Sequence, residues 1–174
     1  MKSFTAFFLA FTLSGFVFSQ SKVPTAEEVL QPALTLAAQK NKNVLLIFHA
    51  SWCGWCRKMD ASLQDGNIKA EIDRSYEVVH LTVHESPNKK ALENPGAMAF
   101  LQKNGAADQG LPFWYVLDKE GKILADAQYK PGQNSGCPAS EEEVAYFISV
   151  LKKTSSLTAA ELEKIRRRFR ENEQ

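Results

Sequence analysis

The stretch HASWCGWCRKMD, residues 49–60, places two cysteines two residues apart, with a tryptophan directly ahead of each. It overlaps NVLLIFHA, residues 43–50, an apolar run that is too short for a helix and predicts a strand buried on both faces. Helical periodicity follows from Cys53 to about Gln64. The strand end, the turn and the helix start therefore place Cys53 in the first turn of a helix.

A cysteine at a helix start has the surroundings of a reactive thiol. Unpaired backbone N–H groups and the positive end of the helix dipole stabilise an anion there. The thiolate is the nucleophile in disulfide exchange, and lowering a thiol pKa from about 8.5 to about 7 represents roughly 2 kcal/mol in favour of the charged form. Cys56, one turn further on, is expected to face inward and to attack only after a mixed disulfide has formed on Cys53.

A zinc site, a haem attachment site and a structural disulfide are the alternatives for the cysteine pair. A zinc site needs about four ligands, but Cys137 and the three histidines are scattered without a second pair at ligand spacing. Haem attachment needs a histidine directly after the second cysteine, and Arg57 stands there. A structural disulfide would close a loop too small to restrain the unfolded chain much. A redox pair without a metal is the favoured interpretation.

Periodicity and capping signals along the rest of the chain predict one α/β domain. Expected strands are residues 43–50, 77–83, 113–118 and 122–128, and expected helices are residues 25–42, 53–64, 68–76, 97–103, 140–153 and 158–170. Ser140 with Glu143 and Thr158 with Glu161 have the spacing of capping boxes. A strand–helix–strand crossover implies parallel neighbours, and a hairpin adds an antiparallel edge. We predict a mixed four-strand sheet with helices on both faces.

Composition and charge limit the classes of partner. The chain has 174 residues and a net charge of +1, so there is no broad electrostatic case for binding nucleic acid or an anionic membrane. Three cysteines are too few for a small disulfide scaffold, so the fold must be held by its core.

The N-terminal residues form a separate segment. Lys2 precedes an apolar stretch over residues 4–18, which is too short and too interrupted for a membrane span of about 20 apolar residues. We expect a signal peptide over residues 1–19, a domain over residues 20–153 and a C-terminal helical extension over residues 154–174. An uncleaved anchor or a buried first helix is the alternative. Export to the periplasm, or secretion, would let the CxxC pair cycle through a disulfide. No membrane-spanning segment is expected in the mature chain.

Residues 44–153 resemble a thioredoxin-fold domain. ASWCGWCRKM, residues 50–59, is similar to the active-site stretch of that family, and LPFWYVLDKEGKIL, residues 111–124, is similar to its proline-bearing β-hairpin. Within the family, the sequence most resembles the exported group that includes the C-terminal domain of the DsbD type of reductase and the small ER thioredoxins. The resemblance implies a three-layer sandwich that exchanges disulfides with protein substrates and with another thiol protein, without a metal or organic cofactor.

The resemblance also assigns roles to individual residues. It implies that Cys53 attacks and Cys56 resolves, and that Pro112 is a cis-proline packed beside the pair. It further implies that Leu111 offers its backbone to an extended substrate. The substrate-binding set expected from it is Trp52, Gly54, Trp55, Leu111 and Pro112.

The sequence departs from thioredoxin in three places. Gly54-Trp55 replaces Gly-Pro between the cysteines, and Ile47 stands where thioredoxin buries an acidic proton acceptor. The stretch over residues 85–110 is longer than in compact members of the family. The first two changes affect the expected redox potential and proton route, and the third affects partner choice.

Other residues carry weaker expectations. His49 could accept a proton but is more simply explained as packed, and His80 and His84 are expected to be structural residues on one strand face. Cys137 is expected to be an exposed free thiol, a regulatory partner or an inert residue. The basic run over residues 166–170 is expected to form a solvated helix face with Phe169 docked inward.

The function expected from the sequence is therefore an exported thiol–disulfide oxidoreductase working through Cys53 and Cys56, in the reductase or isomerase direction. The alternative is a thioredoxin-fold adaptor or chaperone whose cysteines do not turn over. A reversible dithiol–disulfide couple distinguishes the two, because an adaptor does not require one.

Overall fold

The computed structural model describes residues 22–173, and the predicted signal peptide over residues 1–19 lies outside them. The helices are α1 (Ala26–Lys40), α2 (Gly54–Leu63), α3 (Lys69–Ser75), α4 (Ala97–Lys103), α5 (Glu141–Thr154) and α6 (Ala159–Arg170), with 3-10 helices η1 (Pro87–Leu92) and η2 (Glu171–Glu173). The strands are β1 (Asn43–His49), β2 (Tyr76–Thr82), β3 (Phe113–Leu117), β4 (Ile123–Asp126), β5 (Gln128–Lys130) and β6 (Gln133–Asn134). Within residues 22–173, none of the helices has the length and apolar character needed to cross a bilayer.

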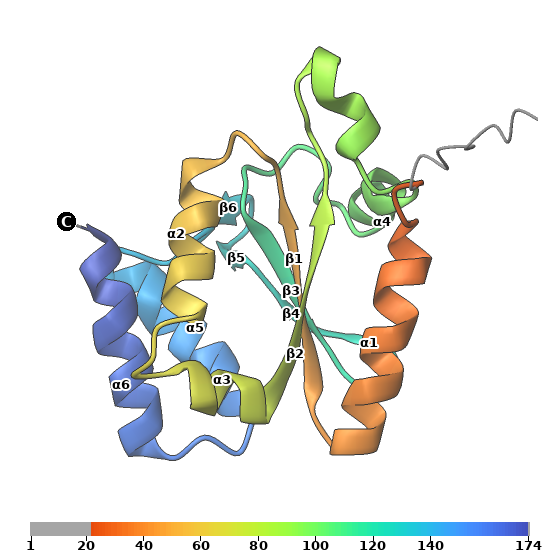
Figure 1. Ribbon diagram of the computed structural model, residues 1–174. Helices are drawn as coiled ribbons and strands as arrows, with labels where there is room; N and C mark the ends of the chain where they lie inside the picture. The colour runs from red at the N-terminus through yellow and green to blue at the C-terminus, as the bar shows by residue number, and fades with distance from the viewer. Residues whose placement is uncertain (1–21, 174) are drawn as a thin grey trace, which may run out of the picture.

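The central sheet has the order β2-β1-β3-β4, with β1 parallel to β2 and antiparallel to β3. The hairpin between β3 and β4 supplies the antiparallel edge. Helices α1 and α4 lie on one side of the sheet, while α2, α5 and α6 lie on the other (Figure 1). The predicted mixed four-strand sheet and three-layer sandwich are confirmed.

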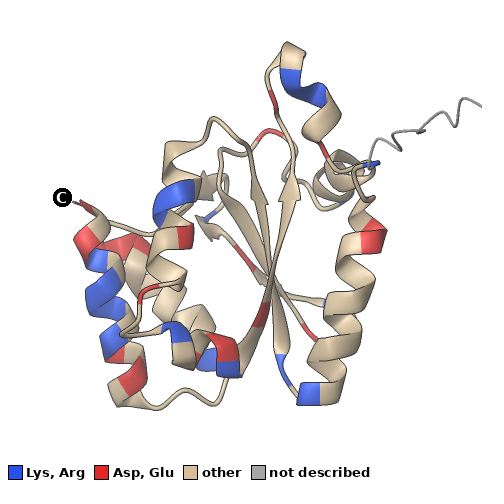
Figure 2. Cartoon of the chain, in the orientation of Figure 1, with Lys and Arg blue, Asp and Glu red and all other residues tan. Residues whose placement is uncertain are grey.

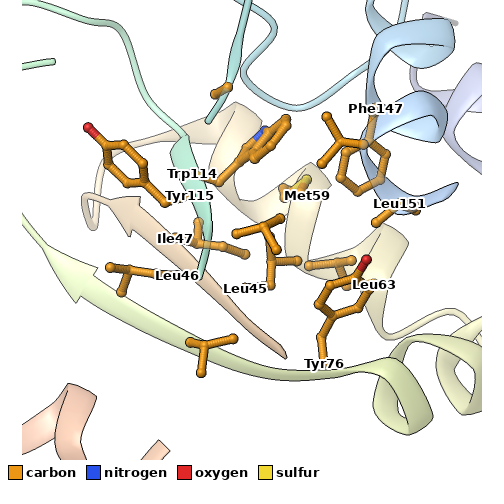
Figure 3. Packing of buried hydrophobic residues seen from close by; sticks show 14 of the residues in the cluster. Leu45, Leu46, Ile47, Met59, Leu63, Tyr76, Trp114, Tyr115, Phe147 and Leu151 are labelled. Atoms are coloured by element: carbon orange, nitrogen blue, oxygen red, sulfur yellow. The ribbon is translucent and has the colours of Figure 1, made fainter. Parts of the chain in front are cut away.

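Neighbouring side chains along a strand point to opposite faces of the sheet. Helices cover both faces (Figure 1), so both sets of side chains are buried. On β3, the Trp114 ring lies 5.4 Å from the ring of Phe147 on α5, whereas the next ring, Tyr115, lies 5.5 Å from Phe100 on α4. Figure 3 shows the α2 and α5 side of this core, where Ile47 and Met59 approach Trp114. The apolar β1 run was correctly predicted as a strand covered from both sides.

The helix starts follow the capping signals in the sequence. Ser140 and Thr158 each cap their helix with a reciprocal hydrogen bond to a glutamate three residues on, and Thr25 does the same for α1. These boxes satisfy backbone N–H groups that the first turn of a helix leaves unpaired. Such local contacts explain why the helix positions were predictable.

The C-terminal helix α6 packs into the same core as the rest of the domain. Phe169 is fully buried, as predicted, and its ring lies 4.8 Å from that of Phe147. Blue and red segments alternate along α6 in Figure 2, and Arg168 forms a 2.7 Å ion pair with Asp65. The prediction of a freely solvated basic face is therefore wrong at Arg168, whose side chain is only 16% exposed.

Two parts of the chain differ from the predicted elements. The expected fourth strand over residues 122–128 ends at Asp126, and the chain then forms a separate two-stranded ribbon from β5 and β6. Residues 85–110 contain η1 as well as the predicted helix α4. Both parts supply side chains that hold loops beside the cysteine pair, Asn134 from the ribbon and Glu85 from the segment ahead of η1.

Candidate active site

Cys53 and Cys56 form a disulfide at the N-terminus of α2, with an S–S distance of 2.07 Å. Cys53 is the N-cap residue, and its Sγ accepts a hydrogen bond of 3.1 Å from the backbone N–H of Cys56. Its own N–H donates to Ala50 O at 3.0 Å, which closes the turn between β1 and α2. The predicted position of Cys53 at the helix start is confirmed, and a backbone donor points at its sulfur.

Both cysteines are buried in the disulfide state, Cys53 at 3% and Cys56 at 2% exposure. The tryptophans that precede them are exposed instead, Trp52 at 57% and Trp55 at 48%. The ammonium group of Lys58 lies 4.7 Å from the centre of the Trp55 ring. The disulfide is thus buried, whereas the two neighbouring tryptophan side chains are exposed.

The peptide bond between Leu111 and Pro112 is cis, as the resemblance implied. Leu111 packs against the small apolar cluster formed by Ala50 and the two cysteines. Two surface hollows meet at Leu111: one extends along Trp52 and residues 107–110, the other along Trp55 and residues 134–137. Of the predicted substrate-binding residues, Trp52, Trp55 and Leu111 line these hollows, and the role of the whole set in binding stays a prediction.

Asn134 on β6 holds the loop that carries Pro112. Its side-chain amide donates to Gly110 O at 2.7 Å and to Pro112 O at 3.1 Å. The indole of Trp114 also donates to Gly136 O at 3.0 Å, which ties the following residues to β3. Sequence reasoning missed Asn134, because it acts on a loop more than twenty residues earlier and no motif marks it.

Glu85 is a second residue that sequence reasoning missed. It follows β2 and is only 3% exposed, yet its carboxylate accepts hydrogen bonds from Ser51 N at 2.5 Å and Ser51 Oγ at 2.9 Å. The backbone hydrogen bond from Ser51 is the main reason that the pKa of Glu85 is lowered. Its only signal in the sequence is an acidic residue just beyond a predicted strand.

The fold and the cysteine pair agree with a match to a known protein family. A family model described as a thioredoxin-like domain matches residues 30–135, more than half of the chain. This chain belongs to the thioredoxin-like family.

Three similar proteins each share less than 30% sequence identity with this chain. Protein disulfide isomerase-like 1-3 of Oryza sativa subsp. japonica is 29% identical over 92 residues, which cover 47% of this chain but only 17% of the rice protein. An uncharacterized protein of Haemophilus influenzae is 26% identical over 132 residues, 74% of this chain and 78% of that protein. The crystal structure of a disulphide isomerase from Xylella fastidiosa Temecula1 matches with a TM-score of 0.52 and 22% identity, covering 95% of this chain and 100% of that one. The structural likeness shows the fold.

Two residues of this thioredoxin-like domain, Ile47 and Arg57, flank the turn that leads to Cys53 and the start of α2. Ile47 is 1% exposed and is paired with His80 on one side and Trp114 on the other, so an aliphatic side chain occupies the position expected for a buried acid. Arg57 donates from its guanidinium to Ser51 O at 3.3 Å, which holds a positive charge beside the turn before Cys53.

His49 is half-buried at the end of β1 in the thioredoxin-like domain. Its Nε2 lies 3.2 Å from Thr82 Oγ1, and its ring centre lies 5.1 Å from that of His80, which in turn contacts Asp60 at 2.8 Å. Burial is the largest cause that lowers the pKa of His49, followed by the neighbouring His80. These contacts support packing, and a proton-acceptor role stays a hypothesis.

We predict that the folded domain loses stability when His49 is forced to take up a proton. Because its folded pKa lies below the ordinary value of 6.5, the unfolded chain binds more protons as the pH falls through 6.5, so stability decreases until the folded pKa is passed. NMR titration of His49 should give a midpoint below 6.5, and His49→Gln should weaken the stability loss seen between neutral and acidic pH. A midpoint at or above 6.5 would contradict the prediction.

His84 was expected on a strand face, but it lies in a loop. His84 lies two residues beyond the end of β2 and has a positive φ of 54°. Its carbonyl oxygen accepts a 2.8 Å hydrogen bond from the Trp52 indole. His84 is structural, as predicted, but it acts through its backbone and from a loop.

Cys137 is buried at 4% exposure, so the expectation of an exposed thiol is wrong. Its sulfur accepts a hydrogen bond of 3.4 Å from the amide of Asn172, which also donates to Ser62 Oγ and Pro138 O. Burial raises the pKa of the Cys137 thiol to about 12. The thiol is therefore neutral at physiological pH and lacks the charge that a nucleophile needs.

We predict that Cys137 takes no part in the redox chemistry. Reduced native protein should incorporate two alkyl groups at pH 8, on Cys53 and Cys56, and a third only after denaturation. Cys137→Ser keeps an acceptor for Asn172 and should leave the midpoint potential unchanged. Rapid native labelling of Cys137, or a shifted potential in the serine variant, would contradict this.

Proposed function

We propose that this protein is an exported thiol–disulfide oxidoreductase that exchanges disulfides with protein substrates through Cys53 and Cys56. The observation that carries the proposal is the disulfide at the start of α2, with the Cys56 N–H directed at Cys53 Sγ and Leu111 packed against the cysteine pair. The same donor can stabilise a Cys53 thiolate in the reduced protein, because a helix N-terminus favours an anion. The exchange requires no metal or organic cofactor.

The proposed reaction proceeds in two balanced steps. The Cys53 thiolate attacks one sulfur of a substrate disulfide, so that a mixed disulfide forms and the other substrate sulfur leaves as a thiolate. Cys56 then loses its proton and attacks Cys53 Sγ, which closes the intramolecular disulfide and releases the second substrate thiolate. Two electrons pass from the cysteine pair to the substrate, and another thiol protein must return them.

Substrate access is proposed along the surface that meets at Leu111. Exposed indoles of Trp52 and Trp55 supply apolar contact area on either side of the buried disulfide. An extended segment lying across Leu111 and Pro112 would bring its own disulfide to Cys53 and Cys56. These two residues form the only disulfide in residues 22–173. The same exposed surface would serve a binding module, so the redox couple itself must decide between the two functions.

The direction we propose is reduction or isomerisation. Gly54 and Trp55 provide no charged group that would stabilise the thiolate strongly, as a dedicated oxidant requires. Arg57 and the aliphatic Ile47 both favour the thiolate relative to thioredoxin and raise the potential somewhat. The potential is expected between about −270 mV, typical of thioredoxin, and about −180 mV, typical of the isomerases.

Equilibration of the purified protein in glutathione buffers tests the function and its direction together. Alkylation followed by mass measurement gives the fraction of dithiol at each ratio of reduced to oxidised glutathione. A reversible couple between about −270 and −180 mV supports the proposal. A value near −120 mV would reverse the direction, and an absent couple would favour an adaptor or chaperone.

Export is a separate part of the proposal and rests on the apolar segment over residues 4–18. Expression of the full chain in a Gram-negative host should yield a periplasmic protein that begins near Gln20. Intact mass of the fractionated protein measures this. A cytoplasmic protein that retains residue 2 would contradict the periplasmic location.

A further inference from the structure

The turn before Cys53 is fastened to the segment that follows β2. Glu85 receives both hydrogen-bond donors of Ser51, the backbone N–H at 2.5 Å and the hydroxyl at 2.9 Å. Ser51 is two residues from Cys53, and the intervening Trp52 is fastened to the same segment through the carbonyl of His84 at 2.8 Å. Two consecutive residues of one loop therefore hold two consecutive residues of the active-site turn.

The loop that supplies these acceptors is itself held in place. The backbone N–H of Glu85 donates to Glu93 Oε1 at 2.7 Å, and Lys90 pairs with the same carboxylate at 2.7 Å. His84 has a left-handed backbone conformation that is uncommon for a residue other than glycine. In this conformation its carbonyl and the next side chain both face the turn before Cys53.

Glu85 also places a charge on the turn that leads to Cys53, at Ser51, two residues before the reactive sulfur. The hydrogen bonds from Ser51 favour its ionised form, and its side chain is screened from water by burial. The charged groups around it are Lys89, whose ammonium lies 3.4 Å from Ser51 Oγ, together with Arg57, Glu93 and the half-buried His49. A carboxylate here opposes the Cys53 thiolate, whereas Lys89 and Arg57 favour it.

We propose that Glu85 is a positioning residue of the exchange site, which holds Cys53 at the N-cap of α2 through Ser51 and moderates its thiolate by charge. This inference rests on the proposed function. Holding the turn keeps Cys53 Sγ in line with the Cys56 N–H, and the carboxylate limits how far that donor shifts the thiol towards its ionised form. Geometry and charge are thus set by one side chain from a different segment of the chain.

Two substitutions separate the two roles. Glu85→Gln keeps the shape and can still accept from Ser51 N–H while donating to Ser51 Oγ, so it removes only the charge. Glu85→Asp keeps the charge but is one methylene too short to reach both Ser51 groups. Glu77→Gln is the matched control, because Glu77 lies near the other end of β2, paired with Lys42 at 2.9 Å.

The first readout is the Cys53 pKa of the reduced protein, from the pH dependence of its alkylation rate. The second is the rate of exchange with a disulfide peptide. Glu85→Gln should raise the ratio of thiolate to thiol at neutral pH about threefold or more, with an exchange rate at or above that of the wild type. Glu85→Asp should lower the exchange rate about fivefold or more without increasing the thiolate ratio, and Glu77→Gln should change neither quantity.

An unchanged Cys53 pKa in folded Glu85→Gln, or a wild-type exchange rate in folded Glu85→Asp, overturns the proposal. Far-UV circular dichroism establishes folding, and if Glu85→Gln does not fold, the rate of Glu85→Asp decides. The alkylation readout does not depend on turnover. Failure of the proposed function would instead appear as a wild-type protein without a reversible couple, so the two failures are distinguishable.

Discussion

Replacing Cys53 by serine is expected to abolish disulfide exchange, whereas replacing Cys56 by serine should leave a protein that accumulates mixed disulfides. The reason is positional, because only Cys53 caps α2 and receives the Cys56 N–H at 3.1 Å. Without Cys53 no thiol remains at the position that the Cys56 N–H can stabilise as a thiolate. Without Cys56 the mixed disulfide forms but has no resolving thiol, so the substrate stays attached.

Exchange with a disulfide peptide, followed by non-reducing mass analysis, measures both outcomes. Cys137→Ser serves as the matched control, since it removes a thiol that is buried and hydrogen-bonded to Asn172 instead of to the cysteine pair. The Cys53→Ser rate should fall to the uncatalysed background, and the Cys56→Ser adduct should map to Cys53. Faster alkylation of Cys56 than of Cys53 in the reduced wild type would reverse the assigned roles.

Phe169→Ala is expected to lower the free energy of unfolding by about 3–5 kcal/mol, the usual cost of removing a buried aromatic ring. The Phe169 side chain is fully buried, and its ring lies 4.8 Å from that of Phe147 on α5. Since small domains are stable by only about 5–15 kcal/mol, this one ring would account for a large part of the total.

Urea unfolding followed by circular dichroism and by tryptophan fluorescence checks the expectation. Arg167→Ala is the control on the same helix, because that side chain is 70% exposed, and its effect should stay within about 0.5 kcal/mol. The two probes should give one transition if α6 belongs to the folding unit. A loss below about 1 kcal/mol for Phe169→Ala would instead support a separate extension beginning at residue 154.

The sequence by itself determined the six α-helices, the four strands of the central sheet and their order along the chain. Apolar runs predicted the strands β1, β2 and β3, and the capping boxes opened by Ser140 and Thr158 predicted the start of the last two α-helices. The cysteine spacing predicted the redox pair and its place at a helix start. These signals are local, because a helix cap or a strand pattern depends on residues within a few positions of one another.

Only the tertiary structure decided what surrounds that pair. The contact of Glu85 with Ser51 spans 34 residues, and that of Asn134 with Pro112 spans 22. Cys137 is buried because the end of the chain, through Asn172, returns to cover its loop. A buried polar group must find a partner, but its own neighbours in sequence do not specify which one. The choice depends on how the sheet brings distant loops together, so the motif was readable in the sequence and its supports were not.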